Sequence, residues 1–389
     1  MPVVVTCEFC GKTVEKPVRT AGSGRFCSSD CYKKSRRQEN VDTMAQAKTR
    51  ISVLEKELAK AYAQRSVVRQ LVDATVNAVH DLPQLEIFNH DLDRPINDEL
   101  DPEDVILHIS DCQIGSWVSP EYTGGLGNYD YPVFCNRVDR YVHNVRKILR
   151  YHPNKIETCH IVLGGDIVDG GTIFLGHQRQ IDTLVVKQVV YAYEHLSRII
   201  ADMAGMFDEV VVSCIPGNHG RIGKKGEMSP TDNMDWLAYY FLQERCASIE
   251  NVRFNIPDTW WMVLKVRGWK WLISHGDDFK AWSGIPFYGA LRYKNKMREL
   301  LSDTFCKNGE EFPDFDAILV GHHHELASFS NIFMNGNWVG GSEFSLKTLQ
   351  AGGMPYQQMI GVHDRVLKAW YRPIMLEDVR TLPAMPVYS

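Results

Sequence analysis

The feature that most restricts the fold of this chain is a regular alternation of short apolar stretches and helical stretches from residue 105 onward. The apolar stretches lie at 105–110, 160–164, 210–215, 271–274 and 317–321, and they have the length of buried strands. Residues 132–150 and 184–205 are helical in character, and four tryptophans around a Gly268 turn in residues 258–275 indicate a hairpin. Such an alternation predicts an α/β fold.

Each of the five predicted strands runs into a side chain that can bind a metal ion. The side chains at the strand ends are Asp111, Asp166, Asn218 with His219, His275, and His322 with His324. Because the ligand sites of open α/β sheets lie at the carboxyl ends of the strands, we expect these side chains to converge. A single histidine at a strand end is more often structural, but five strands that all end this way indicate a shared site.

These side chains also form a chemically consistent donor set. Carboxylates, an amide oxygen and imidazoles suit Mn, Fe, Zn or similar ions that keep open coordination positions. One carboxylate can bridge two ions, and two ions roughly 3.5–4 Å apart clamp a phosphate and polarise a water for in-line attack. The pattern therefore predicts a two-metal phosphoesterase.

The residues stand in motifs that resemble, in the same order, those of the calcineurin-like metallophosphoesterases. The family motifs are Asp-x-His, Gly-Asp-x-x-Asp, Gly-Asn-His, a single His and Gly-His-x-His. This chain reads Asp111-Cys112-Gln113, Gly165-Asp166-Ile167-Val168-Asp169, Gly217-Asn218-His219, His275-Gly276 and Gly321-His322-His323-His324, within about residues 105–345. The resemblance implies a four-layer fold, with two packed mixed β-sheets flanked by helices. It also implies hydrolysis of phosphodiester bonds by a metal-bridging hydroxide.

The resemblance further implies a role for each residue. The expected ligands of the first ion are Asp111, Asp166 and His324. Those of the second ion are Asp166, Asn218, His275 and His322, so Asp166 would bridge. His219 corresponds to the catalytic histidine of the family, which stabilises the transition state or protonates the leaving oxygen. Asp169 would orient that imidazole, and His323 is expected to point away.

One position departs from the family pattern. Gln113 stands where the family usually has histidine, and an amide oxygen is a harder and weaker ligand than an imidazole nitrogen. Either Gln113 holds the first ion loosely or it binds no metal. The departure favours Mn²⁺ as the active-site ion, with Fe, Zn or Ni as the other candidates.

A cluster of four cysteines precedes the α/β region. Cys7 and Cys10 form one close pair and Cys27 and Cys31 another, so four thiolates can close a tetrahedron around one structural Zn²⁺. The phrases CEFCGK and RFCSSDC resemble small zinc modules appended to phage and nuclease proteins. The other six cysteines are scattered singly, which indicates reduced thiols. We expect residues 1–37 to form a zinc module that binds either DNA or protein.

Residues 38–80 are expected to form a long helix, followed by a Pro-, Asp- and Asn-rich linker at 81–104. Residues 41–80 lack Pro and Gly and are rich in good helix formers. Ala47, Ile51, Leu54, Leu58 and Ala61 follow heptad spacing, although for only two heptads. The helix either forms a coiled-coil homodimer or lies on the body, and we favour the dimer. The catalytic domain would then span 105–375, with a tail at 376–389.

The distribution of charge bears on the substrate. Residues 1–37 carry eight basic and three acidic side chains, and their +5 leaves −10 for the rest of a chain of net charge −5. A basic module, a dimer helix as in break-repair nucleases, and the phrases GGSEFS and GVHDR, which resemble phage-encoded exonuclease-like members, favour nucleic acid. An acidic body opposes DNA binding, although bound metal ions would offset some of its charge.

The first interpretation is therefore a DNA nuclease. A phosphatase or phosphodiesterase for phosphoproteins or small nucleotides is the alternative. A third hypothesis, a degenerate binding scaffold, is supported by Gln113 alone.

Several further residues lie near the motifs. Arg221 either contacts a substrate phosphate or is a solvated loop arginine. His177 and Arg179 belong to a loop that could border the cleft, with His177 on its rim. Trp260 and Trp261 are expected to pack in the hairpin rather than to stack on bases. The chain has no run of 18 apolar residues and no apolar signal core. We therefore expect a cytoplasmic protein without a membrane partner, located in the host cytoplasm if phage-encoded.

Overall fold

The computed structural model describes residues 3–16, 25–36, 50, 72–87, 96–97, 99–174, 176–223, 225–281, 285–305, 314–348 and 353–378. The chain divides into two compact units, residues 1–77 and residues 78–389. The larger unit contains both main sheets and all the strand-end residues singled out above.

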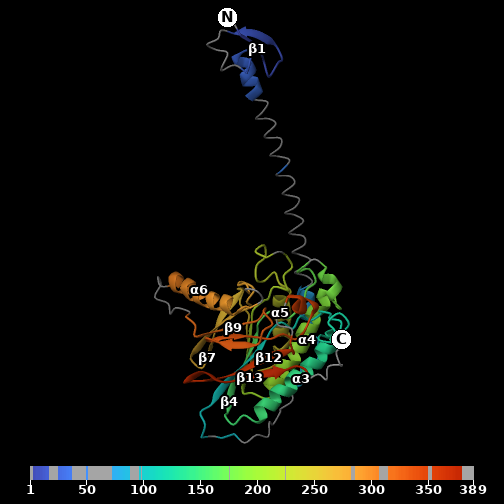
Figure 1. Ribbon diagram of the computed structural model, residues 1–389, viewed down its shortest axis with the longest axis vertical. Helices are drawn as coiled ribbons and strands as arrows, with labels where there is room; N and C mark the ends of the chain where they lie inside the picture. Colours follow the sequence, from blue (N-terminus) through green and yellow to red (C-terminus); the bar gives the residue numbers. More distant parts are fainter. Residues whose placement is uncertain are drawn as a thin grey trace, which may run out of the picture. The chain divides into compact units, whose positions relative to one another are not determined.

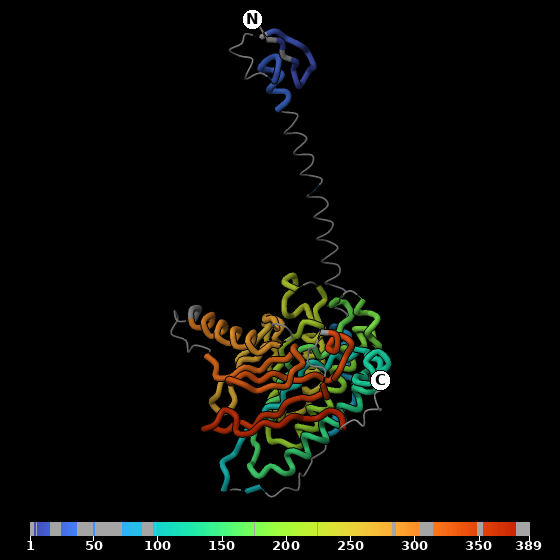
Figure 2. Tube along the Cα trace, in the orientation of Figure 1, coloured from blue at the N-terminus to red at the C-terminus, as the bar shows by residue number. Residues whose placement is uncertain are grey.

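The first sheet of the larger unit has six strands in the order β13-β12-β3-β4-β5-β6. Its strands are β3 Glu103–Ile109, β4 Ile156–Leu163, β5 Glu209–Cys214, β6 Val252–Asn255, β12 Tyr356–His363 and β13 Val366–Met375. β3 to β6 run parallel, whereas β12 is antiparallel to β3 and to β13. The last two strands, red in Figure 2, thus join a sheet whose other strands come much earlier in the chain. The first three predicted strands are confirmed.

The second sheet has five strands in the order β10-β11-β9-β8-β7. Its strands are β7 Trp261–Val266, β8 Trp269–Ser274, β9 Ala317–Val320, β10 Ala327–Phe329 and β11 Ile332–Met334. β7 and β8 form the predicted hairpin, and Arg267 and Gly268 turn it with positive φ angles of 47° and 87°. β8 and β9 are parallel neighbours, so their carboxyl ends also lie side by side.

The two sheets pack face to face. Ile106, Val162 and Ile360 of the six-stranded sheet share one buried cluster with Trp271 and Leu319 of the five-stranded sheet. The opposite face of the five-stranded sheet is covered by helix α6, Phe287–Phe305, whose apolar side chains join a second cluster. This burial on both faces explains why the central strands read as nearly continuous apolar runs.

Three long helices lie in the connections between the parallel strands of the six-stranded sheet: α3 Tyr131–Arg150, α4 Val185–Ala204 and α5 Met234–Arg245. α3 begins where the Asp130 carboxylate accepts the Val133 N–H at 2.8 Å, and the helix then buries one apolar stripe. Figure 1 shows α3 and α4 on one side of the paired sheets and α6 on the other. The four-layer α/β fold with two mixed sheets is confirmed. None of the described helices is both long and apolar enough to cross a membrane.

The smaller unit contains the four-cysteine cluster. A short hairpin of β1, Val3–Thr6, and β2, Thr13–Lys16, is followed by a helix at residues 29–36. Residues 72–80 are helical, as predicted, and 72–77 belong to this unit. The predicted heptad seam lies outside the described residues, so the coiled coil stays a prediction.

Candidate metal centre and cleft

The loops that follow five strands deliver the predicted side chains to one place. Asp111 follows β3, Asp166 follows β4 and Asn218 follows β5, while His275 follows β8 and His322 follows β9. Donor atoms of Asp166, His275 and His322 all lie within 4.8 Å of one another. The predicted convergence of ligands from both sheets is therefore present in the structure.

His275 lies at the centre of the first group of donors. Its Nε2 lies 3.0 Å from Asp166 Oδ2 and 3.2 Å from Asn218 Oδ1. Its Nδ1 donates to the Gly164 carbonyl at 2.8 Å, which fixes the ring and turns Nε2 towards the carboxylate. Such an arrangement is suited to an imidazole that binds a cation through Nε2.

Asp111 anchors the second group. The carboxylate accepts the His322 N–H at 3.0 Å, and its Oδ1 lies 3.3 Å from His324 Nε2. Gln113 is buried, and its side-chain nitrogen lies 3.4 Å from the same His324 atom. The two ends of a side-chain amide have nearly the same shape, so a 180° rotation of the Gln113 amide would place Oε1 beside His324. The side chain of Gln113 thus reaches the donor set.

A substitution tests whether Gln113 weakens the first ion's site. We expect Gln113→His to lower the Mn²⁺ dissociation constant about tenfold or more, because imidazole is a stronger ligand than an amide. The measurement is a calorimetric Mn²⁺ titration. The matched control is Gln178→His, which places the same new imidazole on an exposed residue and should change nothing. An unchanged titration of Gln113→His would show that this position does not contact the metal.

The donors are carried on strained backbone. The φ angles are positive at Asp111, Gln113, Asp166, His322 and His324, between 44° and 64°. Non-glycine residues in this left-handed region cost about 1–3 kcal/mol each, and they gather where function requires a particular side-chain direction. Five such residues in one site indicate that the fold tolerates local backbone strain because this strain directs the side chains towards the site.

A residue that sequence reasoning missed holds the two central loops together. The carboxylate of Asp235, fully buried at the start of α5, accepts four backbone N–H groups. Oδ2 accepts from Asp166 at 2.8 Å and from Gly217 at 2.9 Å, and Oδ1 accepts from Ile167 and Val168 at 3.1 and 3.0 Å. The loops after β4 and β5 therefore share one anchor. No sequence motif indicates this role of Asp235, because an isolated aspartate in the first turn of a helix is common.

Beside the donors, Asp169 holds two imidazoles. Its Oδ1 lies 2.8 Å from His219 Nδ1, and its Oδ2 lies 3.0 Å from His177 Nε2. The Ile173 N–H donates to His177 Nδ1 at 3.3 Å, so Nε2 of His177 carries the proton that Asp169 accepts. The expected contact between Asp169 and His219 is present. His177 lines the cleft, as expected of its loop, but the expectation that it lies on the rim is wrong, because only 2% of its surface is accessible.

The electrostatics of the site favour cations. Burial disfavours the charged form of His275, but Asp166 and Asp111 outweigh it and raise the pKa of His275 to about 10. Asp166 and Asp169 likewise overcome burial and raise the pKa of His219 to about 9. Burial also disfavours ionisation of Asp111 and Asp166, yet the neighbouring histidines hold the pKa of both carboxyls below the usual range. The ionised carboxylates therefore stabilise positive charge at this position, and a divalent ion would supply that charge in place of the imidazole proton.

Most of the metal donors line a cleft of about 720 Å³. Besides the donors, its lining includes a set of apolar side chains, called here the apolar wall: Trp117, Ile173, Phe174, Phe279 and Phe344. Outside that cleft lining, Arg221 is ion-paired with Asp277, and its guanidinium lies 5.5 Å from the ring centre of Trp260. Arg221 is therefore not a freely solvated loop residue, and its contact with a substrate phosphate stays a prediction.

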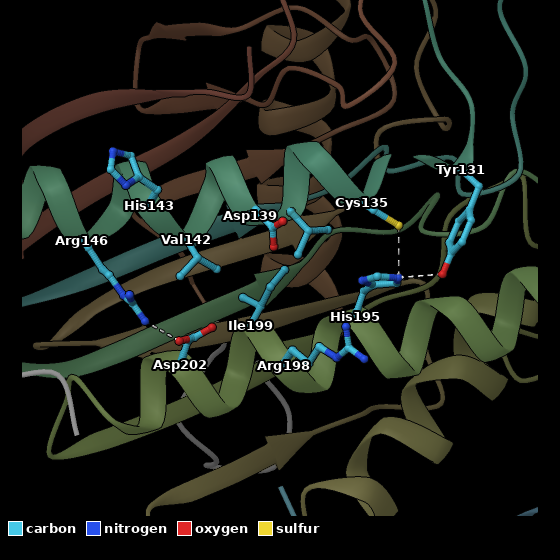
Figure 3. Close-up of a pocket in the computed structure, with 11 residues that line it drawn as sticks. Tyr131, Cys135, Asp139, Val142, His143, Arg146, His195, Arg198, Ile199 and Asp202 are labelled. Carbon is cyan, nitrogen blue, oxygen red and sulfur yellow. Dashed lines mark hydrogen bonds and ion pairs between the residues drawn. The ribbon is translucent and has the colours of Figure 1, made fainter. Parts of the chain in front are cut away.

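A second hollow, of about 510 Å³, lies between α3 and α4 (Figure 3). In it, His195 Nε2 lies 3.0 Å from the Tyr131 hydroxyl and 3.7 Å from Cys135 Sγ. Burial raises the pKa of the Cys135 thiol and lowers the pKa of His195 to about 4. The thiol therefore stays protonated and is no activated nucleophile.

In the smaller unit, the four predicted zinc ligands come together. Sγ atoms of Cys7, Cys10, Cys27 and Cys31 all lie within 4.8 Å of one another. Cys10 Sγ is 3.5 Å from Cys27 Sγ, which is 3.3 Å from Cys31 Sγ. Four thiols so arranged fit a closed tetrahedral zinc site.

With this geometry in place, comparison with known proteins defines the class. Residues 105–356 match the model of the calcineurin-like phosphoesterase family, and the chain belongs to that family. The match therefore identifies the chain as a metal-dependent phosphoester hydrolase with two divalent ions in its active site. A search of curated proteins gave no match.

Solved structures with a similar fold are distant. Vacuolar protein sorting 29 from Cryptosporidium parvum has 15% identity and a TM-score of 0.31, over 67% of this chain and 85% of that one. Wild-type Vps29 of Entamoeba histolytica in complex with Zn²⁺ has 12% identity and a TM-score of 0.28, over 70% and 99%. A predicted phosphoesterase from Streptococcus pneumoniae has 12% identity and a TM-score of 0.24, over 70% and 98%. The family assignment therefore depends on the matched model.

Proposed function

We propose that this chain is a two-metal phosphodiesterase that cleaves DNA, with Mn²⁺ as its active-site ion. The observation that carries the proposal is the group of carboxylate, amide and imidazole donors at the carboxyl ends of strands from both sheets. Asp111, Asp166 and His324, with Gln113, would hold the first ion. Asp166, Asn218, His275 and His322 would hold the second. When bound, such ions supply Lewis acidity to the phosphoester and activate water.

The protein's own proton transfer would depend on His219. Asp169 lies at Nδ1 of this ring, so the N–H there donates to the carboxylate and Nε2 faces the donors, 4.0 Å from Asp166 Oδ2. A protonated Nε2 can stabilise charge on the transferring phosphoryl group and give its proton to the leaving oxygen. The hydrogen bond to Asp169 keeps the ring in this orientation.

DNA is favoured as the substrate by the smaller unit. Its helix at 29–36 exposes Lys33, Lys34 and neighbouring Arg36, next to the predicted zinc ligands. Such a basic surface adds affinity for a polyanion. The predicted pairing of residues 41–80 would bring two such modules and two catalytic units into one homodimer.

The proposal is tested by Mn²⁺-dependent digestion of end-labelled single- and double-stranded DNA. We expect wild-type cleavage, with product lengths that give its polarity. His219→Ala should lower the rate at least about a hundredfold, since a positioned proton donor typically contributes 10²–10⁴-fold. Deletion of residues 1–37 should weaken DNA cleavage and leave turnover of bis-p-nitrophenyl phosphate intact.

The other outcomes are equally definite. Absence of DNA cleavage with continued hydrolysis of bis-p-nitrophenyl phosphate would contradict the nuclease and move the function to small nucleotides or phosphoproteins. Absence of both activities at saturating Mn²⁺ would leave a binding scaffold.

A further inference from the structure

The apolar wall of the cleft is unusually exposed. Trp117, Phe174 and Phe344 face the same cleft as the metal donors, with 38%, 47% and 61% of their surface accessible. Large apolar side chains are normally buried, so several exposed rings beside a polar centre mark a binding surface. Phosphate chemistry needs none of them.

Phe174 is held by the catalytic apparatus itself. Its ring stacks on buried His177, with centroids 4.3 Å apart and an interplanar angle of 23°. His177 is in turn bonded to Asp169, which holds His219. One face of the Phe174 ring is thus supported by an imidazole, while nearly half of its surface stays accessible to solvent.

Trp117 lies on a loop fastened to the one that carries Phe174. The Trp117 N–H donates to the Gln180 carbonyl at 2.7 Å, and Ser116 forms an antiparallel bridge with Ile181. The indole also meets Tyr122 edge to face, with ring centres 6.1 Å apart. The loops that carry the two rings are therefore joined by backbone hydrogen bonds at the border of the cleft.

We propose that Phe174 and Trp117 form a nucleobase-stacking subsite beside the metal centre. The inference rests on the proposed function, because the occupant must place a phosphodiester among the metal donors and a flat ring against the wall. Nucleotides combine these two parts, and stacking on aromatic side chains accepts every base. Phe344 closes the same wall from α7, Glu343–Thr348.

The small number of cationic side chains and the accessible rings of the cleft together favour a single-stranded end over a duplex as the substrate. Among the described residues that line it, Lys280 is the one lysine or arginine, whereas Asp166, Asp169, Asp277 and Glu343 are acidic. A duplex is gripped chiefly through phosphate contacts with cationic side chains, and its bases are already stacked. A single-stranded end can offer an unstacked base to the wall instead.

The test is equilibrium binding to the full Mn²⁺-loaded chain, measured by calorimetry with two matched ligands. Thymidine 5′-monophosphate carries a base, and 2-deoxyribose 5-phosphate has the same sugar phosphate without one. We expect wild-type protein to bind the nucleotide about tenfold or more tightly than the sugar phosphate, because stacking of one base on an aromatic ring typically contributes an effect of this size. Phe174→Ala should remove most of this ratio by weakening nucleotide binding, and Phe174→Trp should keep it.

The control is Tyr151→Ala, at a more exposed aromatic residue that directly follows α3 and is 78% accessible, which should change neither constant. Equal binding of the two ligands by wild-type protein would overturn the subsite, whether or not DNA is cleaved. A base preference that disappears in Phe174→Ala, in a protein that does not cleave DNA, would keep the subsite and refute the nuclease. Tighter binding of O-phosphotyrosine than of the nucleotide would assign the wall to phosphoproteins and overturn the proposal.

Discussion

Asp166→Asn is expected to abolish Mn²⁺-dependent hydrolysis of bis-p-nitrophenyl phosphate, with a loss of at least about a thousandfold. Asp166 would bridge both ions. Its Oδ1 accepts the backbone N–H of His219 at 2.7 Å, and its Oδ2 lies 3.0 Å from His275 Nε2. Asparagine keeps the shape but removes the charge and one of the two oxygens. Metal ions supply several kcal/mol of transition-state stabilisation, and about 4 kcal/mol corresponds to a thousandfold in rate.

The measurement is an initial rate at saturating Mn²⁺, with thermal unfolding of the variant recorded alongside. The matched control is Asp202→Asn, the same chemical change on the helical side of the six-stranded sheet, where Asp202 pairs with Arg146 at 2.6 Å. This control should keep its activity, because partly exposed ion pairs contribute little. An Asp166→Asn protein that is folded and retains more than about a tenth of the wild-type rate would refute the bridging role.

The strands and their terminal donors could be predicted because the information is local. Each buried strand is a short apolar run, and the donor follows within a few residues, so order and spacing survive without a structure. The layer arrangement was implied by family resemblance rather than by the residues alone. The pairing of β12 with β3 joins strands at opposite ends of the domain, and no local pattern encodes it.

What could not be predicted depends on contacts between distant loops. His177 lies in a polar loop, where burial is unexpected, yet Asp169 and the Ile173 N–H hold it inside. The apolar wall gathers Trp117 and Phe174 from two loops and Phe344 from α7, and these segments follow different strands. Exposed rings in a sequence look the same as core rings, so only the folded chain reveals them as a surface.

Asp235 is the clearest of these hidden residues, and its removal should have the largest effect on stability. We expect Asp235→Ala to lower the free energy of unfolding of the metal-free protein by about 5 kcal/mol. Four buried N–H groups would lose their acceptor, and each unsatisfied buried donor costs about 1–3 kcal/mol. Water that enters the space left by the carboxylate would recover part of this loss. The measurement is urea unfolding followed by circular dichroism.

Asp235→Asn keeps the volume of the side chain but removes one of its two acceptor oxygens, so it distinguishes the effect of the hydrogen bonds from that of packing. The amide oxygen can still accept two N–H groups, whereas the amide nitrogen would face the other two donors, so we expect a loss between that of alanine and none. Both variants should also bind Mn²⁺ more weakly, because the anchored N–H groups belong to the loops that carry Asp166 and Asn218. If the free energy of unfolding of Asp235→Ala lies within about 1 kcal/mol of the wild-type value, the metal-binding side chains must be positioned by the strands alone. The metal centre would then be independent of α5.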